Sequence, residues 1–128
     1  MAENDTGPGG LLAWQWSLYA VGHTRRANLL IHVFAVPVFQ LGTLALLASP
    51  LLGVTFAMVG PVLMVGAMAA QGRGHAGESE RPVRFEGPLD VIARIMLEQW
   101  ITFPRFVLSG GLAQAWRASA PRNREDLT

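Results

Sequence analysis

Two long apolar runs without a formal charge constrain the fold of this chain more than any other feature of its sequence. The first run covers Leu29–Ala48 and the second covers Leu51–Ala70, and each contains 20 residues. A helix of that length is roughly 30 Å long, which matches the hydrocarbon core of a bilayer. Because only Ser49-Pro50 separates the two runs, they predict an antiparallel transmembrane hairpin. The alternative, a buried hairpin of a soluble protein, rarely has two charge-free runs of this length.

Two further segments are predicted to be helices that lie in or against the membrane. The first covers about residues 11–21 and is rich in aromatic side chains of the kind found at the membrane–water boundary. The second covers about residues 88–109, where Asp90, Arg94 and Glu98 recur every four residues and form a charged stripe. This stripe fits either an amphipathic helix at the interface or a third embedded helix with its stripe facing the bundle interior.

These patterns predict an all-α fold, an integral membrane helical bundle with a transmembrane hairpin and one or two further membrane-associated helices. The bundle is expected to be a single domain over residues 10–117, with helices at about 11–21, 25–48, 51–72 and 88–109. Residues 1–9 and 118–128 are polar and are predicted to be disordered tails.

Composition narrows the classes of function. Charged residues make up 15% of the chain, well below the roughly 25% of an average soluble domain. The net charge of +1 is too small to indicate a nucleic-acid partner. There is no Cys, so a metal site here would have to use imidazole, carboxylate, carbonyl or water ligands.

The distribution of Arg predicts the orientation of the hairpin. Basic residues flank its two open ends and are absent from its turn; they are Arg25, Arg26, Arg73, Arg81 and Arg84. By the positive-inside rule, both open ends face the cytoplasm. We therefore expect an integral protein of a bacterial inner membrane.

The three His residues are the main indication of function. His23 precedes the first run, His32 lies about one turn inside it, and His75 lies just past the end of the second run. Because the hairpin folds back on itself, all three fall at the same membrane face. Asn28 shares a helix face with His32, and Tyr19 shares one with His23.

Three imidazoles with a nearby carboxylate have the donor types of an iron or zinc centre. Glu78, three residues after His75, is the expected carboxylate, either as a ligand or as a general base. Asn28, Tyr19 and Gln71 are candidates for outer partners that orient the rings. The alternative is that these polar groups only satisfy one another inside the bilayer.

Two motifs resemble a known family, the yeast-type 2-hydroxy fatty acid dioxygenases. The motifs are Tyr19-x3-His23-x4-Asn28-x3-His32 followed by Pro37, and Gly74-His75-x2-Glu78-x3-Pro82 preceded by Gln71. The resemblance covers roughly Trp14 to Gly111. It implies a small Fe(II)-dependent membrane enzyme of fatty acid α-oxidation that uses O2 to shorten a long-chain 2-hydroxy fatty acid by one carbon.

The resemblance also implies roles for individual residues. His23, His32 and His75 would hold the iron, with Glu78, and less directly Asn28, as ligand or outer partner. An Arg would hold the substrate carboxylate by a two-pronged hydrogen bond, and the candidates are Arg73, Arg81 and Arg84. The expected partners are a lipid or fatty acid, O2 and the membrane.

Two other functions are also compatible with the sequence. One is a Zn(II)-dependent membrane hydrolase that uses Glu78 as its base. The other is a non-enzymatic membrane scaffold, in which the charged stripe would be a partner surface. Assembly into a homo-oligomer is also left open.

Overall fold

The computed structural model describes residues 10–120, and these residues form helices and their connections with no strand. The elements are α1 (Gly10–Tyr19), α2 (Arg26–Leu52), α3 (Val54–Ala76), α4 (Pro88–Leu97), the π-helix η1 (Glu98–Thr102), α5 (Phe103–Leu108) and α6 (Gly111–Ala118). The predicted all-helical fold is confirmed. The segments 1–9 and 121–128, which hold most of the two expected tails, lie outside the described residues.

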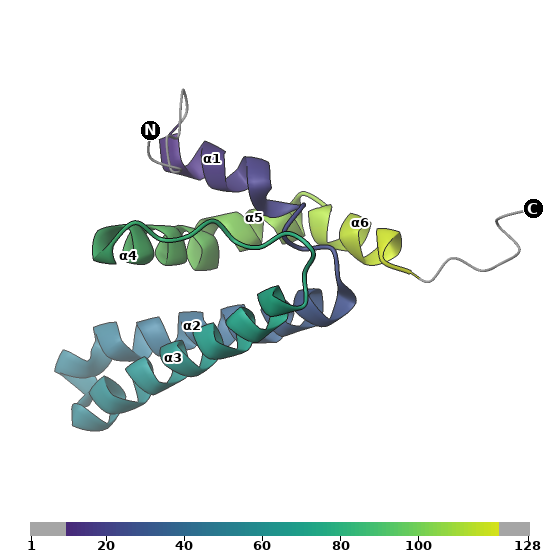
Figure 1. Ribbon diagram of the computed structural model, residues 1–128. Coiled ribbons are helices and arrows are strands. Elements are labelled where there is room, and N and C mark those ends of the chain that lie inside the picture. Colours follow the sequence, from purple (N-terminus) through teal and green to yellow (C-terminus); the bar gives the residue numbers. More distant parts are fainter. Residues whose placement is uncertain (1–9, 121–128) are drawn as a thin grey trace, which may run out of the picture.

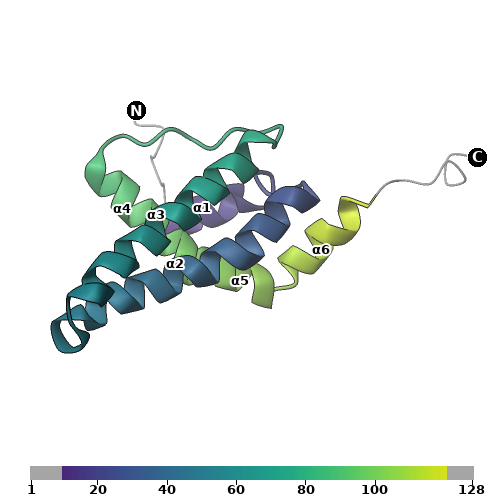
Figure 2. The ribbon, with the colours of Figure 1, turned by 90° about the horizontal axis from the view of Figure 1, so that it is seen from below.

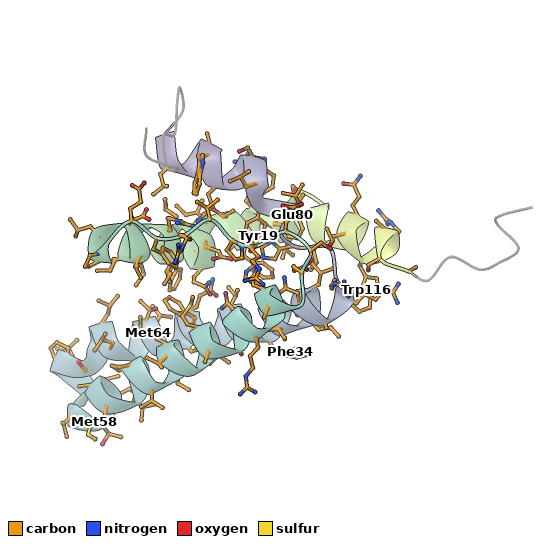
Figure 3. The ribbon with its side chains drawn as sticks, viewed as in Figure 1. Tyr19, Phe34, Met58, Met64, Glu80 and Trp116 are labelled. Carbon is orange, nitrogen blue, oxygen red and sulfur yellow. The ribbon has the colours of Figure 1, made fainter. Side chains whose placement is uncertain are left out.

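The hairpin of α2 and α3 dominates the structure, and α1 and α4–α6 lie along one side of it (Figure 1). Within the described residues, α2 and α3 are the helices long and apolar enough to cross a membrane. Only 33% and 17% of their most apolar stretches are buried, whereas the core helix of a soluble protein would be mostly buried. Phe34 and Met58 point away from the other helices (Figure 3) and are 71% and 66% exposed. The hairpin thus presents an apolar outer surface.

The turn of the hairpin lies at Gly53, slightly later than the predicted Ser49-Pro50 turn. Helix α2 continues through Pro50, which has no N–H to donate to the carbonyl of Leu46. The hydroxyl of Ser49 donates to that carbonyl instead, at 2.7 Å. Gly53 has a φ of +103°, a conformation that residues with a Cβ rarely adopt. The chain therefore reverses at the glycine and not at the proline.

The two hairpin helices approach most closely where Gly42 faces Gly60. A Cβ placed on Gly42 would lie 2.7 Å from the carbonyl oxygen of Gly60, and a Cβ on Gly60 would lie 2.6 Å from the carbonyl oxygen of Gly42. Small residues that let helix backbones meet in this way are a common basis of helix packing in membranes. Gly66, which lies on the same helix as Gly60, has open space around it.

Gly60→Ala is expected to lower the free energy of unfolding by about 1–3 kcal/mol, because backbone atoms on the facing helix cannot yield to the added methyl group. Gly66→Ala, in the same helix, is the matched control. It should leave the stability unchanged or raise it by less than about 1 kcal/mol through helix propensity. Thermal unfolding of both variants in detergent measures the difference, and equal effects at the two positions would contradict this packing.

A long connection, residues 77–87, returns from the end of α3 to the start of α4 along the length of the molecule (Figures 1 and 2). Helices α4, η1 and α5 then follow one another without a break, over the segment predicted as 88–109. Two members of the charged stripe, Arg94 and Glu98, face inward. Of the two interpretations of the stripe, the structure favours the one in which it faces the interior of the bundle.

Two apolar clusters flank a polar interior. One joins α1, α2 and α5 through Tyr19, Leu29, Val36, Phe103 and Phe106. The other joins α2 and α3 through Ala35, Phe39 and Ala67. Between them lie buried polar side chains, among which are His23, Asn28, His32, Gln71, Gln99 and Thr102. Burying this many polar groups is costly unless they are paired, so their partners identify the site.

Candidate metal centre

The three His side chains meet at the open end of the hairpin, as the sequence predicted. His23 lies in the connection between α1 and α2, His32 in the second turn of α2, and His75 in the last turn of α3. The ring centroids are 4.5 Å apart for His23 and His32, 4.8 Å for His23 and His75, and 4.9 Å for His32 and His75. The break at Gly22-Thr24 allows His23 to turn back onto the face of α2 that carries His32.

Glu98 completes the group. One ligand atom from each of the four side chains lies within 4.8 Å of all the others, so the group can hold a metal ion. The Oε1 atom of Glu98 is 3.5 Å from Nε2 of His32 and 3.9 Å from Nε2 of His23. Glu98 belongs to the charged stripe and was not among the site residues predicted from the sequence.

Hydrogen bonds to the backbone fix the tautomers of two of the imidazoles. The Nδ1 atom of His23 lies 2.7 Å from the carbonyl oxygen of Tyr19, and that of His32 lies 2.9 Å from the carbonyl oxygen of Asn28. A carbonyl oxygen only accepts, so both Nδ1 atoms carry the proton and donate it. In neutral rings, both Nε2 atoms then present lone pairs.

These two Nε2 atoms face each other at 3.2 Å. Two lone pairs at this distance repel unless a cation lies between them. Two nitrogen ligands of one ion at about 2.1 Å from the metal would be roughly 3.0–3.4 Å apart in octahedral or tetrahedral geometry. The observed separation fits that range, and the facing carboxylate of Glu98 adds a negative charge.

Protonation of the His23 ring does not supply this cation near pH 7. Burial, together with the neighbouring His32, lowers the pKa of His23 to about 3. The ring is therefore neutral near pH 7, and its lone pair is available to a metal. In addition, Nδ1 of His75 is buried and has no hydrogen-bond partner among residues 10–120. An unpaired buried nitrogen in the third ring fits a role in binding an ion or a ligand.

Tyr19 supports the group in three ways. Its backbone carbonyl orients His23, its ring stacks on the His23 ring with centroids 3.9 Å apart, and its hydroxyl donates to Oε1 of Glu98 at 3.1 Å. Burial and the nearby carboxylate of Glu98 raise the pKa of Tyr19 well above its usual value, so the hydroxyl keeps its proton. Tyr19 thus contacts both His23 and Glu98, and its predicted role as an outer partner of a metal stays a prediction.

Glu78 has a different place from the one expected. The Oε1 atom of Glu78 accepts from the backbone N–H groups of Thr24 and Arg25 and from Nδ2 of Asn28, and its Oε2 accepts from the Thr24 hydroxyl. These hydrogen bonds lower the pKa of Glu78 although burial acts in the opposite direction. The carboxylate therefore ties the chain after His23 to the end of α3. It is not a member of the four-residue group, and its bonds leave it poorly placed to act as a base.

Asn28 contacts the His group through its backbone carbonyl and contacts Glu78 through its side chain. Its carbonyl orients His32, and its side chain donates to Glu78 at 3.0 Å and to the carbonyl of Gly22 at 3.2 Å. The backbone of α3 passes directly over this side chain at Gly74, where a Cβ would clash with Oδ1 of Asn28. The glycine that precedes His75 therefore permits the close approach of the two motifs.

A network of amides holds the π-helix that carries Glu98. The side chains of Gln71 and Gln99 donate to each other at 2.9 and 2.8 Å, and Gln40 donates to the backbone carbonyl of Gln99 at 2.8 Å. Pro104, in the following turn, has no N–H to donate to the carbonyl of Trp100. π-Turns of this kind are frequent at functional sites. The predicted outer partner Gln71 thus reaches the group through η1.

Two cavities open beside the group. The larger, of about 790 Å³, and the smaller, of about 220 Å³, both reach His75 and Glu98. Of the three predicted carboxylate-binding residues, Arg81 lines both cavities, Arg84 lines the larger one, and Arg73 lines neither. The structure therefore brings Arg81 and Arg84 to the site and leaves Arg73 on the exposed side of α3.

No known protein family, no curated protein and no solved structure matches this chain.

Proposed function

We propose that this protein is a membrane-embedded, Fe(II)-dependent dioxygenase that shortens long-chain 2-hydroxy fatty acids by one carbon. The observation that supports this proposal most strongly is the pair of Nε2 lone pairs of His23 and His32, which face each other at 3.2 Å beside the carboxylate of Glu98. Imidazole and carboxylate donors suit non-haem iron, and they suit zinc as well. The choice of iron rests on the resemblance of the two His motifs to the 2-hydroxy fatty acid dioxygenases.

The proposed reaction balances with O2 as the oxidant. The C1–C2 bond of the 2-hydroxy acid breaks, C1 leaves as CO2, and C2 becomes the carboxyl carbon of the shortened acid. The two carbons together lose four electrons, and these reduce the two oxygen atoms of O2 to the oxidation level that they have in the products. Bound Fe(II) would supply the route for these electrons. The equation is RCH(OH)COOH + O2 → RCOOH + CO2 + H2O.

Within this proposal, the residues of the chain hold and orient the reactants. His23, His32, His75 and Glu98 would hold the ion, and Tyr19 would keep the Glu98 carboxylate in place. The aromatic and aliphatic packing around His32, which is fully buried, would exclude water from one side of the ion. The cavities beside His75 and Glu98 leave the other side open to substrate, as a catalytic metal site requires.

The proposed location is a bacterial inner membrane, with the metal group at the cytoplasmic face. The Arg residues at the open ends of the hairpin favour this orientation through the positive-inside rule. An acyl chain could then lie in the bilayer while its carboxylate and 2-hydroxyl reach the site near the interface.

Anaerobically purified protein, loaded with Fe(II) and given 2-hydroxyhexadecanoic acid and O2, is expected to release pentadecanoic acid, with one O2 consumed per product. Mass spectrometry of the products and an oxygen electrode measure both quantities. Zinc-loaded protein is the matched control and should give no product, because Zn(II) has no redox chemistry. Iron-loaded protein that consumes no O2 would contradict the proposed reaction. A zinc-loaded protein that hydrolyses lipid esters would support the hydrolase in its place.

A further inference from the structure

The larger cavity adjoins the metal group along one side. It lies between the end of α3, the connection 77–87 and the α4–η1 segment, and its volume of about 790 Å³ falls within the usual range of small-molecule sites. His75 and Glu98, two members of the metal group, form part of its wall. A molecule in this cavity would therefore touch the group directly.

Part of the cavity wall is apolar. Met68 lies seven residues before His75 on α3, which is about two helical turns closer to the hairpin turn. Ile95 lies almost one turn before Glu98 on the facing helix. Met64, also from α3, packs with these two side chains around the same apolar cluster and lies between the hairpin and α4 (Figure 3). Flexible Met side chains suit contact with a flexible hydrocarbon chain.

Of the three Arg residues that line this wall, Arg94 is buried, whereas Arg81 and Arg84 are exposed. The guanidinium of Arg94 donates to the carbonyls of Val83 and Arg84 and lies over the rings of Trp14 and Phe85, so it fixes the connection 77–87. Arg81 is exposed and lines both cavities that reach the group. An Arg in this position can bind a carboxylate with two parallel hydrogen bonds.

We infer that the larger cavity binds the substrate lengthwise, with the carboxylate at Arg81 and the hydrocarbon tail over Met68 and Ile95, and that the open space at Gly72 admits long chains. The inference rests on the proposed function, because it takes the substrate to be a 2-hydroxy fatty acid. Gly72 lines the cavity, and a Cβ placed on it would meet no atom within 4 Å. A larger side chain at this position would fill cavity space without disturbing the packing of α3.

Gly72→Leu tests the length of the site. Equilibrium binding of radiolabelled acids to Fe(II)-loaded protein, measured without O2, should weaken by at least about tenfold for 2-hydroxyhexadecanoate. It should weaken by less than about threefold for 2-hydroxybutanoate, whose chain is too short to reach past Gly72, about one turn from His75. Gly66→Leu is the matched control, because Gly66 is also a glycine of α3 with open space around it and does not line the cavity. It should leave both affinities unchanged. Equal loss of both acids in Gly72→Leu, or no loss of either, would overturn the inference.

Arg81→Gln tests the anchor independently of that variant. It should weaken the binding of 2-hydroxyhexadecanoate by about tenfold or more, and it should not affect the binding of the uncharged methyl ester. Arg73→Gln removes the same charge from the same end of the hairpin and should have little effect on either ligand. An equal effect of Arg73→Gln and Arg81→Gln would show a general electrostatic attraction and contradict a specific anchor.

The metal content of every sample separates this inference from the proposed function. Protein that retains iron and binds both acids without the expected selectivity would refute the cavity assignment alone. Protein that retains no iron under the same conditions would refute the metal centre itself.

Discussion

His32→Ala is expected to lower the metal content of the purified protein from about one ion per chain to less than about one tenth of that value. His32 is fully buried, its ring lies against both other His rings, and its Nε2 faces Glu98 at 3.5 Å. The substitution removes one of the four ligand side chains, the one that lies near each of the other three. Elemental analysis of protein purified after anaerobic loading with Fe(II) measures the effect.

Phe39→Ala is the matched control for this experiment. Phe39 is a buried residue of the same helix, two turns further along, and it packs in the apolar cluster with Ala35 and Ala67. The truncation should lower the stability by about 3–5 kcal/mol and leave the metal content of the folded fraction unchanged. His32→Gln keeps a polar side chain at this buried position, so it can be measured if the Ala variant does not fold. Full metal content in His32→Gln and His32→Ala would exclude His32 as a ligand.

Glu98→Gln is expected to weaken metal binding much more than Glu78→Gln does. Glu98→Gln should weaken metal binding by at least about a hundredfold, because it removes the only carboxylate of the group. Glu78→Gln should weaken it by no more than about tenfold, because Glu78 bonds to Thr24, Arg25 and Asn28 and not to the His rings. Competition with a chelator of known affinity measures both values.

The stability of the Glu78 variant provides a second test through its pH dependence. The pKa of Glu78 is lower in the folded protein than in the unfolded chain, so its contribution to stability is present above the unfolded-state pKa. That contribution of about 2 kcal/mol should be lost as the pH falls through the unfolded-state and then the folded-state pKa. The unfolding temperatures of wild type and Glu78→Gln should therefore differ near pH 7 and converge in acid. A stronger loss of metal in Glu78→Gln than in Glu98→Gln would reverse the assignment of the two carboxylates.

The hairpin and the meeting of the three His residues could be predicted from the sequence. Two apolar runs of bilayer length determine two adjacent helices, and a residue at the start of one and another at the end of the next must then lie at the same level. The turn was predicted a few residues too early, because a proline usually ends a helix and Pro50 was therefore placed in the turn. The helix tolerates this proline through the Ser49 hydroxyl and ends at Gly53, where the backbone needs a positive φ.

The carboxylate of the group could not be predicted in the same way. Glu78 is close to His75 in sequence, but its orientation depends on the backbone N–H groups of Thr24 and Arg25, which belong to another part of the chain. Glu98 reaches the group only because the connection 77–87 returns along the molecule and a π-turn rotates the helix. The sequence did contain one indication of the role of Glu98. Charged residues on an otherwise apolar membrane helix usually face the interior of the bundle and belong to a functional site. The sequence alone left open which way the stripe faced.

The most direct test of the metal centre is the iron content of wild-type protein that is purified without O2, loaded with Fe(II) and washed free of unbound ion. We expect about one iron per chain, held through the imidazoles of His23, His32 and His75 and the carboxylate of Glu98. Iron content close to zero in the folded wild-type protein, or iron that survives the loss of both His32 and Glu98, would contradict the metal centre and leave the buried polar cluster with a structural role.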